Sequence, residues 1–342
     1  MTLSRGWIMR RPLPRALLIV VLLLLPGASR AAQDKAVDVA AAMGRGINIL
    51  GYDGVWEGGV NAPFRMGNLA LIRDTGFHHV RINMVAFRFM DDRNQLDPAF
   101  LERLDSVLEQ VIANDLIPVI DEHDYDFCQS APDQCAIKLK AFWQTLSARY
   151  AGRFPSLVFE ILNEPGGTMT PPDWNALALN ILGIIRASNP DRTVIVSGIN
   201  SDDPGQIREL HLPPDDRNLI LTIHYYAPLA FTHQGAPWSP LFASHVGINW
   251  GNASDKKTLT TYFEAVDAWA KQEGRPVYLG EFGVFERAPP DQRTQYLAFV
   301  ARTAERLGWP WAYWQFDHDF AAFDSKRQSW IKPVIEALFP KR

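Results

Sequence analysis

The chain reads HVRINMVAFRFMDDRNQLDPAFLERLDSVLEQVIANDLIPVIDE over residues 79–122, a stretch that joins two kinds of hydrophobic pattern. Two short β-rich runs, residues 79–84 and 117–122, flank a longer segment with helical periodicity. Asp97 is placed as the N-cap of that helix and Pro98 as its first residue. The apolar stripe of the helix comprises Leu101, Leu104, Leu108, Val111 and Ile112. The stretch therefore predicts one strand–helix–strand unit of an α/β protein.

The same alternation continues along the chain from about residue 44. Strands are predicted at residues 46–50, 79–84, 117–122, 158–163, 193–197, 219–224, 277–281 and 311–316. Amphipathic segments separate them, and no Pro/Gly/Ser-rich linker interrupts the series. This favours a single-domain (β/α)₈ TIM barrel over residues 44–342. A doubly wound open sheet is the rival fold, but its Gly-rich phosphate turn should follow the first strand, whereas Gly44-Arg45-Gly46 precedes it.

Residues 1–31 form a predicted secretory signal peptide. Arginines precede an apolar run at residues 16–25, and Ser29-Arg30-Ala31 fits a small-x-small cleavage site. A membrane anchor is the alternative, but the run is shorter than the roughly 20 apolar residues that span a bilayer. We therefore expect an exported protein, periplasmic or extracellular, with no stable membrane anchor after cleavage. Residues 32–43 would form an N-terminal segment before the barrel.

Charge and cysteine content narrow the set of partners. Removal of residues 1–31 takes away five arginines and no acidic residue, so the net charge changes from −4 to −9. An acidic exported protein is poorly suited to bind nucleic acid, whereas neutral sugars remain compatible. Cys128 and Cys135 are expected to form a disulfide in an oxidising compartment. We expect a monomer that requires no cofactor.

Polar side chains occur where the predicted strands end, which in a (β/α)₈ barrel is the catalytic face. They are Arg81, His123, Asn163, Glu164, His224, Tyr226, Glu281 and Trp314. Each has a structural alternative when taken alone, such as a solvated turn at Asn163-Glu164-Pro165 or a buried ion pair at Arg81. Their joint occurrence at successive strand ends favours a functional site. Two carboxylates, one protonated and one ionised, are what hydrolysis of a glycosidic bond requires.

The motifs around these residues resemble glycoside hydrolase family 5, the large cellulase family within the (β/α)₈ clan A hydrolases. They are Val-Arg-Ile-Asn around Arg81, Ile-Asp-Glu-His ending at His123, Asn163-Glu164-Pro165, His224-Tyr225-Tyr226, Gly280-Glu281-Phe282-Gly283 and Tyr-Trp-Gln-Phe around Trp314. The resemblance covers roughly residues 44–340. It implies Glu164 as the acid/base, Glu281 as the nucleophile and retention of anomeric configuration.

The physical requirements of a retaining mechanism suggest further roles. We expect Arg81 and Tyr226 to hydrogen-bond Glu281 and keep it ionised. The charge of Glu281 is expected to raise the pKa of Glu164 by repulsion. Asn163 is expected to bond the sugar 2-hydroxyl, which requires a bulge or twist of the strand at Asn163-Glu164.

The remaining strand-end residues are predicted to bind substrate or support the site. His123 and His224 would hold sugar hydroxyls or neighbouring groups, and Trp314 would stack on a pyranose ring. Asp121, His123 and Asp124 raise a metal site as an alternative. No further ligand cluster accompanies them, so no metal is predicted.

Loops after the first, sixth and eighth predicted strands are expected to line a groove that sets specificity. They carry Trp56, the segment FTHQGAPW at residues 231–238 and the segment DHDF at residues 317–320. The alternative for Trp238 and Trp250 is that they only fill space beneath a long loop.

These observations predict an exported, metal-independent, retaining endo-β-1,4-glucanase that acts on cellulose or mixed-linkage glucan. A β-mannanase or another β-glycanase of the same family is the nearest alternative. A non-catalytic polysaccharide-binding barrel is the alternative from a different class, and the presence of both Glu164 and Glu281 argues against it.

Overall fold

The computed structural model describes residue 2 and residues 27–51, 53–58, 62–200 and 204–340. The predicted signal peptide therefore lies outside the described residues, apart from residue 2 and residues 27–31. Residues 27–31 begin the first helix, α1 (Gly27–Met43), which continues through the predicted segment 32–43. Within the described ranges, no helix has both the length and the apolar character needed to cross a membrane.

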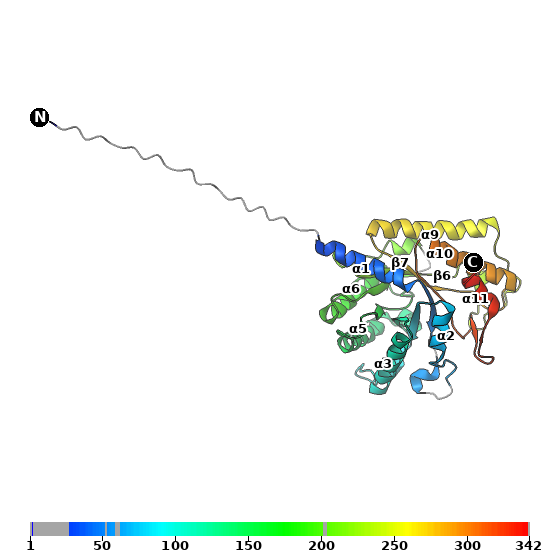
Figure 1. Ribbon diagram of the computed structural model, residues 1–342, viewed down its shortest axis with the longest axis horizontal. Coiled ribbons are helices and arrows are strands. Elements are labelled where there is room, and N and C mark those ends of the chain that lie inside the picture. Colours follow the sequence, from blue (N-terminus) through cyan, green and yellow to red (C-terminus); the bar gives the residue numbers. More distant parts are fainter. Residues whose placement is uncertain (1, 3–26, 52, 59–61, 201–203, 341–342) are drawn as a thin grey trace.

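Eight parallel strands close into one barrel in chain order, and helices surround it (Figure 1). The strands are β1 (Arg45–Ile49), β2 (His79–Met84), β3 (Ile117–Glu122), β4 (Val158–Glu160), β5 (Val194–Ser197), β6 (Leu219–Tyr225), β7 (Val277–Phe282) and β8 (Trp311–Tyr313). The predicted (β/α)₈ TIM barrel is confirmed. β4 and β8 end earlier than the predicted strands 158–163 and 311–316, because only single hydrogen bonds to the neighbouring strands continue beyond Glu160 and Tyr313.

The outer helices follow the strands in the order expected for βα units. The longer ones are α2 (Asn68–Thr75), α3 (Pro98–Ala113), α5 (Pro132–Arg149), α6 (Pro171–Ser188), α9 (Ala253–Glu273), α10 (Pro290–Arg306) and α11 (Lys332–Leu338). Loops carry the short elements η1 (Gly54–Glu57), η2 (Ala86–Phe89), α4 (Tyr125–Ser130), α7 (Pro204–Ile207), α8 (Leu229–Thr232) and the hairpin β9 (Phe323–Asp324) with β10 (Ser329–Trp330). α3 begins as predicted, because the Asp97 carboxylate accepts a hydrogen bond from the Ala99 N–H at 2.7 Å.

The backbone after β4 contains the distortion predicted at Asn163-Glu164. The Asn163 N–H still donates to the Glu122 carbonyl at 2.8 Å, as a neighbouring strand would. Glu164 then takes a left-handed φ of +39°. A regular strand would point the two side chains to opposite faces, whereas here both line the same cavity.

A second distortion lies in β7. Its pairing with β6 shifts by one residue at Gly280. A Cβ on Gly280 would lie 2.7 Å from the Thr222 hydroxyl and 3.0 Å from Nε2 of His224. Glycine therefore permits the close approach that this bulge needs, next to Glu281.

Helix α1 covers the amino-terminal end of the barrel. Its buried residues Ala36, Ala40 and Met43 pack against inward-facing apolar side chains, which are Val119, Val158, Ile195, Ile220, Tyr278 and Ala312. A larger apolar cluster, which includes Trp143 and Trp174, fills the space between the strands and the outer helices. The apolar cluster packed against α1 fills the amino-terminal end of the barrel, and polar side chains line the cavity at the carboxyl-terminal ends of the strands.

The predicted disulfide is present. Cys128 of α4 and Cys135 of α5 are joined, with their Cα atoms 4.9 Å apart, and both are buried. Ala131 alone separates the two helices in the chain. The disulfide therefore ties α4 to α5 at a second point.

Candidate active site

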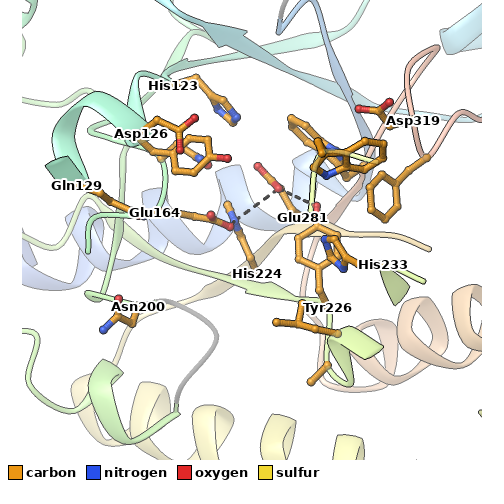
Figure 2. Close-up of a pocket in the computed structure, with 17 residues that line it drawn as sticks. His123, Asp126, Gln129, Glu164, Asn200, His224, Tyr226, His233, Glu281 and Asp319 are labelled. Carbon is orange, nitrogen blue, oxygen red and sulfur yellow. Dashed lines mark hydrogen bonds and ion pairs between the residues drawn. The ribbon is translucent and has the colours of Figure 1, made fainter. Parts of the chain in front are cut away.

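Glu164 and Glu281 approach each other at the carboxyl-terminal end of the barrel (Figure 2). Glu164 follows β4, and Glu281 belongs to β7. A carboxylate oxygen of Glu164 lies within 4.8 Å of a carboxylate oxygen of Glu281. The prediction that folding brings these two side chains across one sugar-sized gap is confirmed.

Two donors hold the Glu281 carboxylate. Nη1 of Arg81 donates to Oε1 at 2.6 Å, and the Tyr226 hydroxyl donates to Oε2 at 2.8 Å. Both predicted contacts are confirmed. Because each oxygen receives a strong hydrogen bond, the orientation of the carboxylate is fixed.

Arg81 lies within the barrel rather than at its mouth. Its side chain has no exposed surface and does not line the cavity. It forms ion pairs with Asp121 at 2.9 Å, Glu160 at 2.7 Å and Glu281 at 2.6 Å. Burial opposes a charged guanidinium, but these three carboxylates raise the pKa of Arg81. Arg81 therefore holds Glu281 from the barrel interior, and it cannot make the predicted contact with the substrate.

Asn163 is oriented by the same arginine. Its Oδ1 accepts from Nη2 of Arg81 at 2.9 Å, and the residue lines the cavity. With Oδ1 occupied, the Nδ2 group is the part of the amide that can donate to a substrate hydroxyl.

Glu164 is paired with His224. Nδ1 of His224 lies 2.6 Å from Oε1 of Glu164 and 3.6 Å from Oε2 of Glu281. Burial raises the pKa of Glu164, and the Asp126 carboxylate adds to the increase. The predicted cause is repulsion by the charge of Glu281, whereas the largest cause is desolvation and the carboxylate that adds to it is Asp126. Burial also lowers the pKa of His224 to about 4, so its imidazole is neutral near pH 7.

His123 and Trp314 form a stacked pair on the cavity wall. Their ring centroids are 5.4 Å apart with an interplanar angle of 6°. Nδ1 of His123 lies 2.6 Å from Oδ2 of Asp121, and burial lowers the pKa of His123 to about 4. The stacking fixes the plane of the Trp314 indole, which lines the cavity as predicted.

The cavity has a volume of about 960 Å³. Of the predicted site residues, it is lined by His123, Asn163, Glu164, His224, Tyr226, Glu281 and Trp314. It is also lined by residues that the sequence analysis did not indicate, namely Tyr125, Asp126, Gln129, Asn200, Ala227 and Leu229. These lie on α4, on α8 and in loops, where no sequence periodicity marks the direction of a side chain.

The loop predictions have mixed outcomes. Four residues of the predicted loops line the cavity, namely His233, Trp238, Asp319 and Phe320. Trp238 is 46% exposed. Trp56 does not line it: the side chain is fully buried and its Nε1 donates to the Leu50 carbonyl at 2.7 Å. Trp250 is buried against Tyr296, in agreement with the alternative that it fills space beneath a loop.

The alternative metal site at Asp121, His123 and Asp124 is not supported by their contacts. Oδ2 of Asp121 already bonds His123 and Arg81, and Oδ2 of Asp124 accepts from the Phe87 N–H at 2.8 Å. Across the described part of the chain, the carboxylate and imidazole groups close enough to share an ion are Glu164, His224 and Glu281.

Comparison with known proteins identifies the family. The model of the family described as Cellulase (glycosyl hydrolase family 5) matches residues 41–319. The chain belongs to glycosyl hydrolase family 5. Endoglucanase H of Acetivibrio thermocellus is 28% identical over 250 residues, which are 71% of this chain and 26% of that protein. Endoglucanase A of Clostridium longisporum is 26% identical over 269 residues, which are 73% of this chain and 50% of that protein. The chain thus spans half or less of the length of these two relatives.

Solved structures in the family match over most of the barrel. Endoglucanase Cel5A of Thermotoga maritima has 32% identity and a TM-score of 0.82, covering 89% of this chain and 99% of its own. Clostridial cellulose synthase subunit Z of Clostridioides difficile has 30% identity and a TM-score of 0.81, covering 87% of this chain and 99% of its own. Both similarities agree with the family assignment.

Proposed function

We propose that this protein is a retaining endo-β-1,4-glucanase that hydrolyses cellulose or mixed-linkage β-glucan. The observation that carries the proposal is the separation of Glu164 and Glu281, whose nearest oxygens lie within 4.8 Å. Retaining glycosidases place the two carboxyl groups about 5–5.5 Å apart, whereas inverting enzymes need about 6.5–9.5 Å for an intervening water. The short separation supports direct attack by one carboxylate.

In the first step, the ionised Glu281 attacks the anomeric carbon and forms a glycosyl ester. Arg81 and Tyr226 hold its two oxygens, so the carboxylate is already oriented before the substrate binds. Glu164 gives its proton to the departing glycosidic oxygen as the C–O bond breaks. Burial raises the pKa of Glu164, which favours the protonated form that this step needs.

In the second step, water attacks the anomeric carbon of the ester, and Glu281 leaves as a carboxylate. Glu164, now ionised, accepts the proton of the water, which returns both groups to their starting states. The neutral His224 contacts Oε1 of Glu164, which leaves Oε2 for the leaving oxygen or the water. Two displacements at one carbon give net retention of configuration.

The substrate class follows from the relatives. The names of the similar proteins are mainly endoglucanases, which favours a β-1,4-glucan. β-Mannan is the second candidate, because the endoglucanase of Thermotoga maritima has been crystallised with both cellobiose and mannotriose. We also propose export to the periplasm or the medium, on the basic and apolar pattern of residues 1–31.

A panel of polysaccharides tests the proposal. Purified protein should release reducing ends from carboxymethylcellulose and mixed-linkage glucan faster than from mannan or xylan. Proton NMR at early times should show the β-anomer first, and the α-anomer first would exclude retention. Binding of glucan without hydrolysis would instead favour the non-catalytic barrel.

A further inference from the structure

Helix α4 (Tyr125–Ser130) forms the cavity wall beside the acid/base. Asp126 and Gln129 line the cavity on the side of Glu164 (Figure 2). The helix has six residues, too few to be stable through its own hydrogen bonds. Its position must therefore come from contacts with the rest of the protein.

The disulfide supplies one such contact. Cys128 lies in the middle of α4, and its bond to Cys135 fixes it to the long helix α5. A ring contact between Phe127 and Phe87, 5.8 Å between centroids, adds a second attachment. Gln129 follows Cys128 directly, so the disulfide determines where the Gln129 backbone can lie.

Gln129 is in turn bound to the loop that carries Glu164. Its Nε2 donates to the backbone carbonyl of Glu164 at 3.3 Å. Its own carbonyl accepts from the N–H of Thr168 at 3.2 Å and from the Thr168 hydroxyl at 3.1 Å. A Cβ on Gly167 would lie 2.6 Å from the same carbonyl, so the loop is packed directly on Gln129.

The backbone of Glu164 needs such support. Its φ of +39° lies in the left-handed region, which a residue with a Cβ adopts only when its surroundings impose it. A change of this φ to a negative value would reorient the Glu164 side chain relative to β4. The Nε2 of Gln129 binds the backbone carbonyl of Glu164 and therefore opposes such a rotation of its backbone.

We propose that Gln129, fixed by the Cys128–Cys135 disulfide, is a positioning residue that holds Glu164 in its reactive orientation. This inference rests on the proposed function, because it concerns the acid/base of that mechanism. It extends the site to α4, whose residues are not at a strand end.

Substrates with different leaving groups provide the test. Cleavage of a cello-oligosaccharide expels a sugar alkoxide, a poor leaving group that needs protonation by Glu164. Cleavage of 2,4-dinitrophenyl β-cellobioside expels 2,4-dinitrophenolate, which leaves without protonation. In Gln129→Met, kcat/KM for the oligosaccharide should fall about tenfold or more, while kcat/KM for the aryl glycoside stays within about twofold. Ser130→Ala is the matched control, since that side chain bonds only backbone within α4, and it should change neither value.

The outcomes separate the inference from the proposed function. Glu164→Ala should lose activity on the oligosaccharide selectively, and the absence of that selectivity would remove the acid/base role itself. If Glu164→Ala is selective but Gln129→Met lowers both values equally, or lowers neither, Gln129 does not position Glu164.

The disulfide is tested in the same assay. The double variant Cys128→Ser with Cys135→Ser should show the selective loss seen for Gln129→Met, because α4 loses its anchor. Equal activity of this folded variant and the parent on the oligosaccharide would overturn the role of the disulfide. If the double variant does not fold, Gln129→Met still tests whether Gln129 positions Glu164.

Discussion

The Nδ1 atom of His224 lies 2.6 Å from Oε1 of Glu164, so a neutral imidazole lies directly against the carboxyl group that must carry a proton. Burial lowers the pKa of His224 to about 4 and raises the pKa of Glu164. The imidazole therefore does not compete for the proton near pH 7. The two opposite shifts place the transferable proton on Glu164.

Glu281→Gln should keep the fold and lose nearly all turnover. The amide preserves the shape of the side chain but is a far weaker nucleophile, so kcat on carboxymethylcellulose should fall by about 10³-fold or more. The thermal unfolding temperature should change little. Retention of more than a few per cent of the activity would exclude the nucleophile role.

Arg81→Met should destabilise the protein strongly. It leaves Asp121, Glu160 and Glu281 in the barrel without their shared cation, which is expected to cost about 3–5 kcal/mol in the free energy of unfolding. Urea titration measures the difference. Arg153→Met is the control, because that arginine is 41% exposed where it pairs with Asp105 and should cost about 1 kcal/mol or less. Equal costs for the two variants would contradict this account of the barrel interior.

Asp126→Asn should shift the alkaline limb of the pH dependence of kcat/KM to lower pH. That limb reports deprotonation of the general acid, and the Asp126 charge raises the pKa of Glu164. Removal of the negative charge lowers this pKa, so Glu164 loses its proton at a lower pH. Asp133→Asn, at an exposed position on α5, is the charge-matched control. A limb that stays in place, or moves upward, would contradict the prediction.

His79 should make stability depend on pH. It is fully buried between the Met43 carbonyl and the Tyr278 hydroxyl, and burial lowers its pKa to about 4. The pKa of His79 is lower in the folded protein than in the unfolded chain, so the neutral histidine contributes its full share to the free energy of unfolding above about pH 6.5. This contribution is lost as the pH falls toward 4, by about 1.4 kcal/mol per pH unit. His79→Gln should remove the His79 share of this dependence from urea unfolding curves, while the buried His123 and His224 keep theirs. The same substitution at the exposed His78 is the control, and parallel curves for the parent and His79→Gln would refute the prediction.

Chelation should leave the activity intact. Glu164, His224 and Glu281 are close enough to hold an ion, but both oxygens of Glu281 already receive hydrogen bonds from Arg81 and Tyr226. A cation would have to displace these donors. Activity on carboxymethylcellulose should therefore be unchanged after dialysis against EDTA. A loss that added Zn²⁺ or Mn²⁺ restores would point to a metallohydrolase.

Local patterns predicted the fold and the two glutamates that meet in the cavity. The capped helix that begins at Asp97 and Pro98 depends on neighbouring residues, which a single sequence contains in full. Glu164 and Glu281 follow or end apolar strands, and the barrel brings the ends of all its strands to one face. The predicted strand 158–163 was too long, because an apolar run does not show where backbone pairing stops.

The tertiary structure decided what depends on residues far apart in the chain. The sequence by itself determined that the chain alternates strands and helices and that two glutamates end strands. Only folding made Asp121 and Glu160 partners of Arg81, buried Trp56 beneath its loop, and placed Gln129 against the backbone of Glu164. Local periodicity describes which side of its own element a residue faces, whereas these contacts depend on how separate elements pack together.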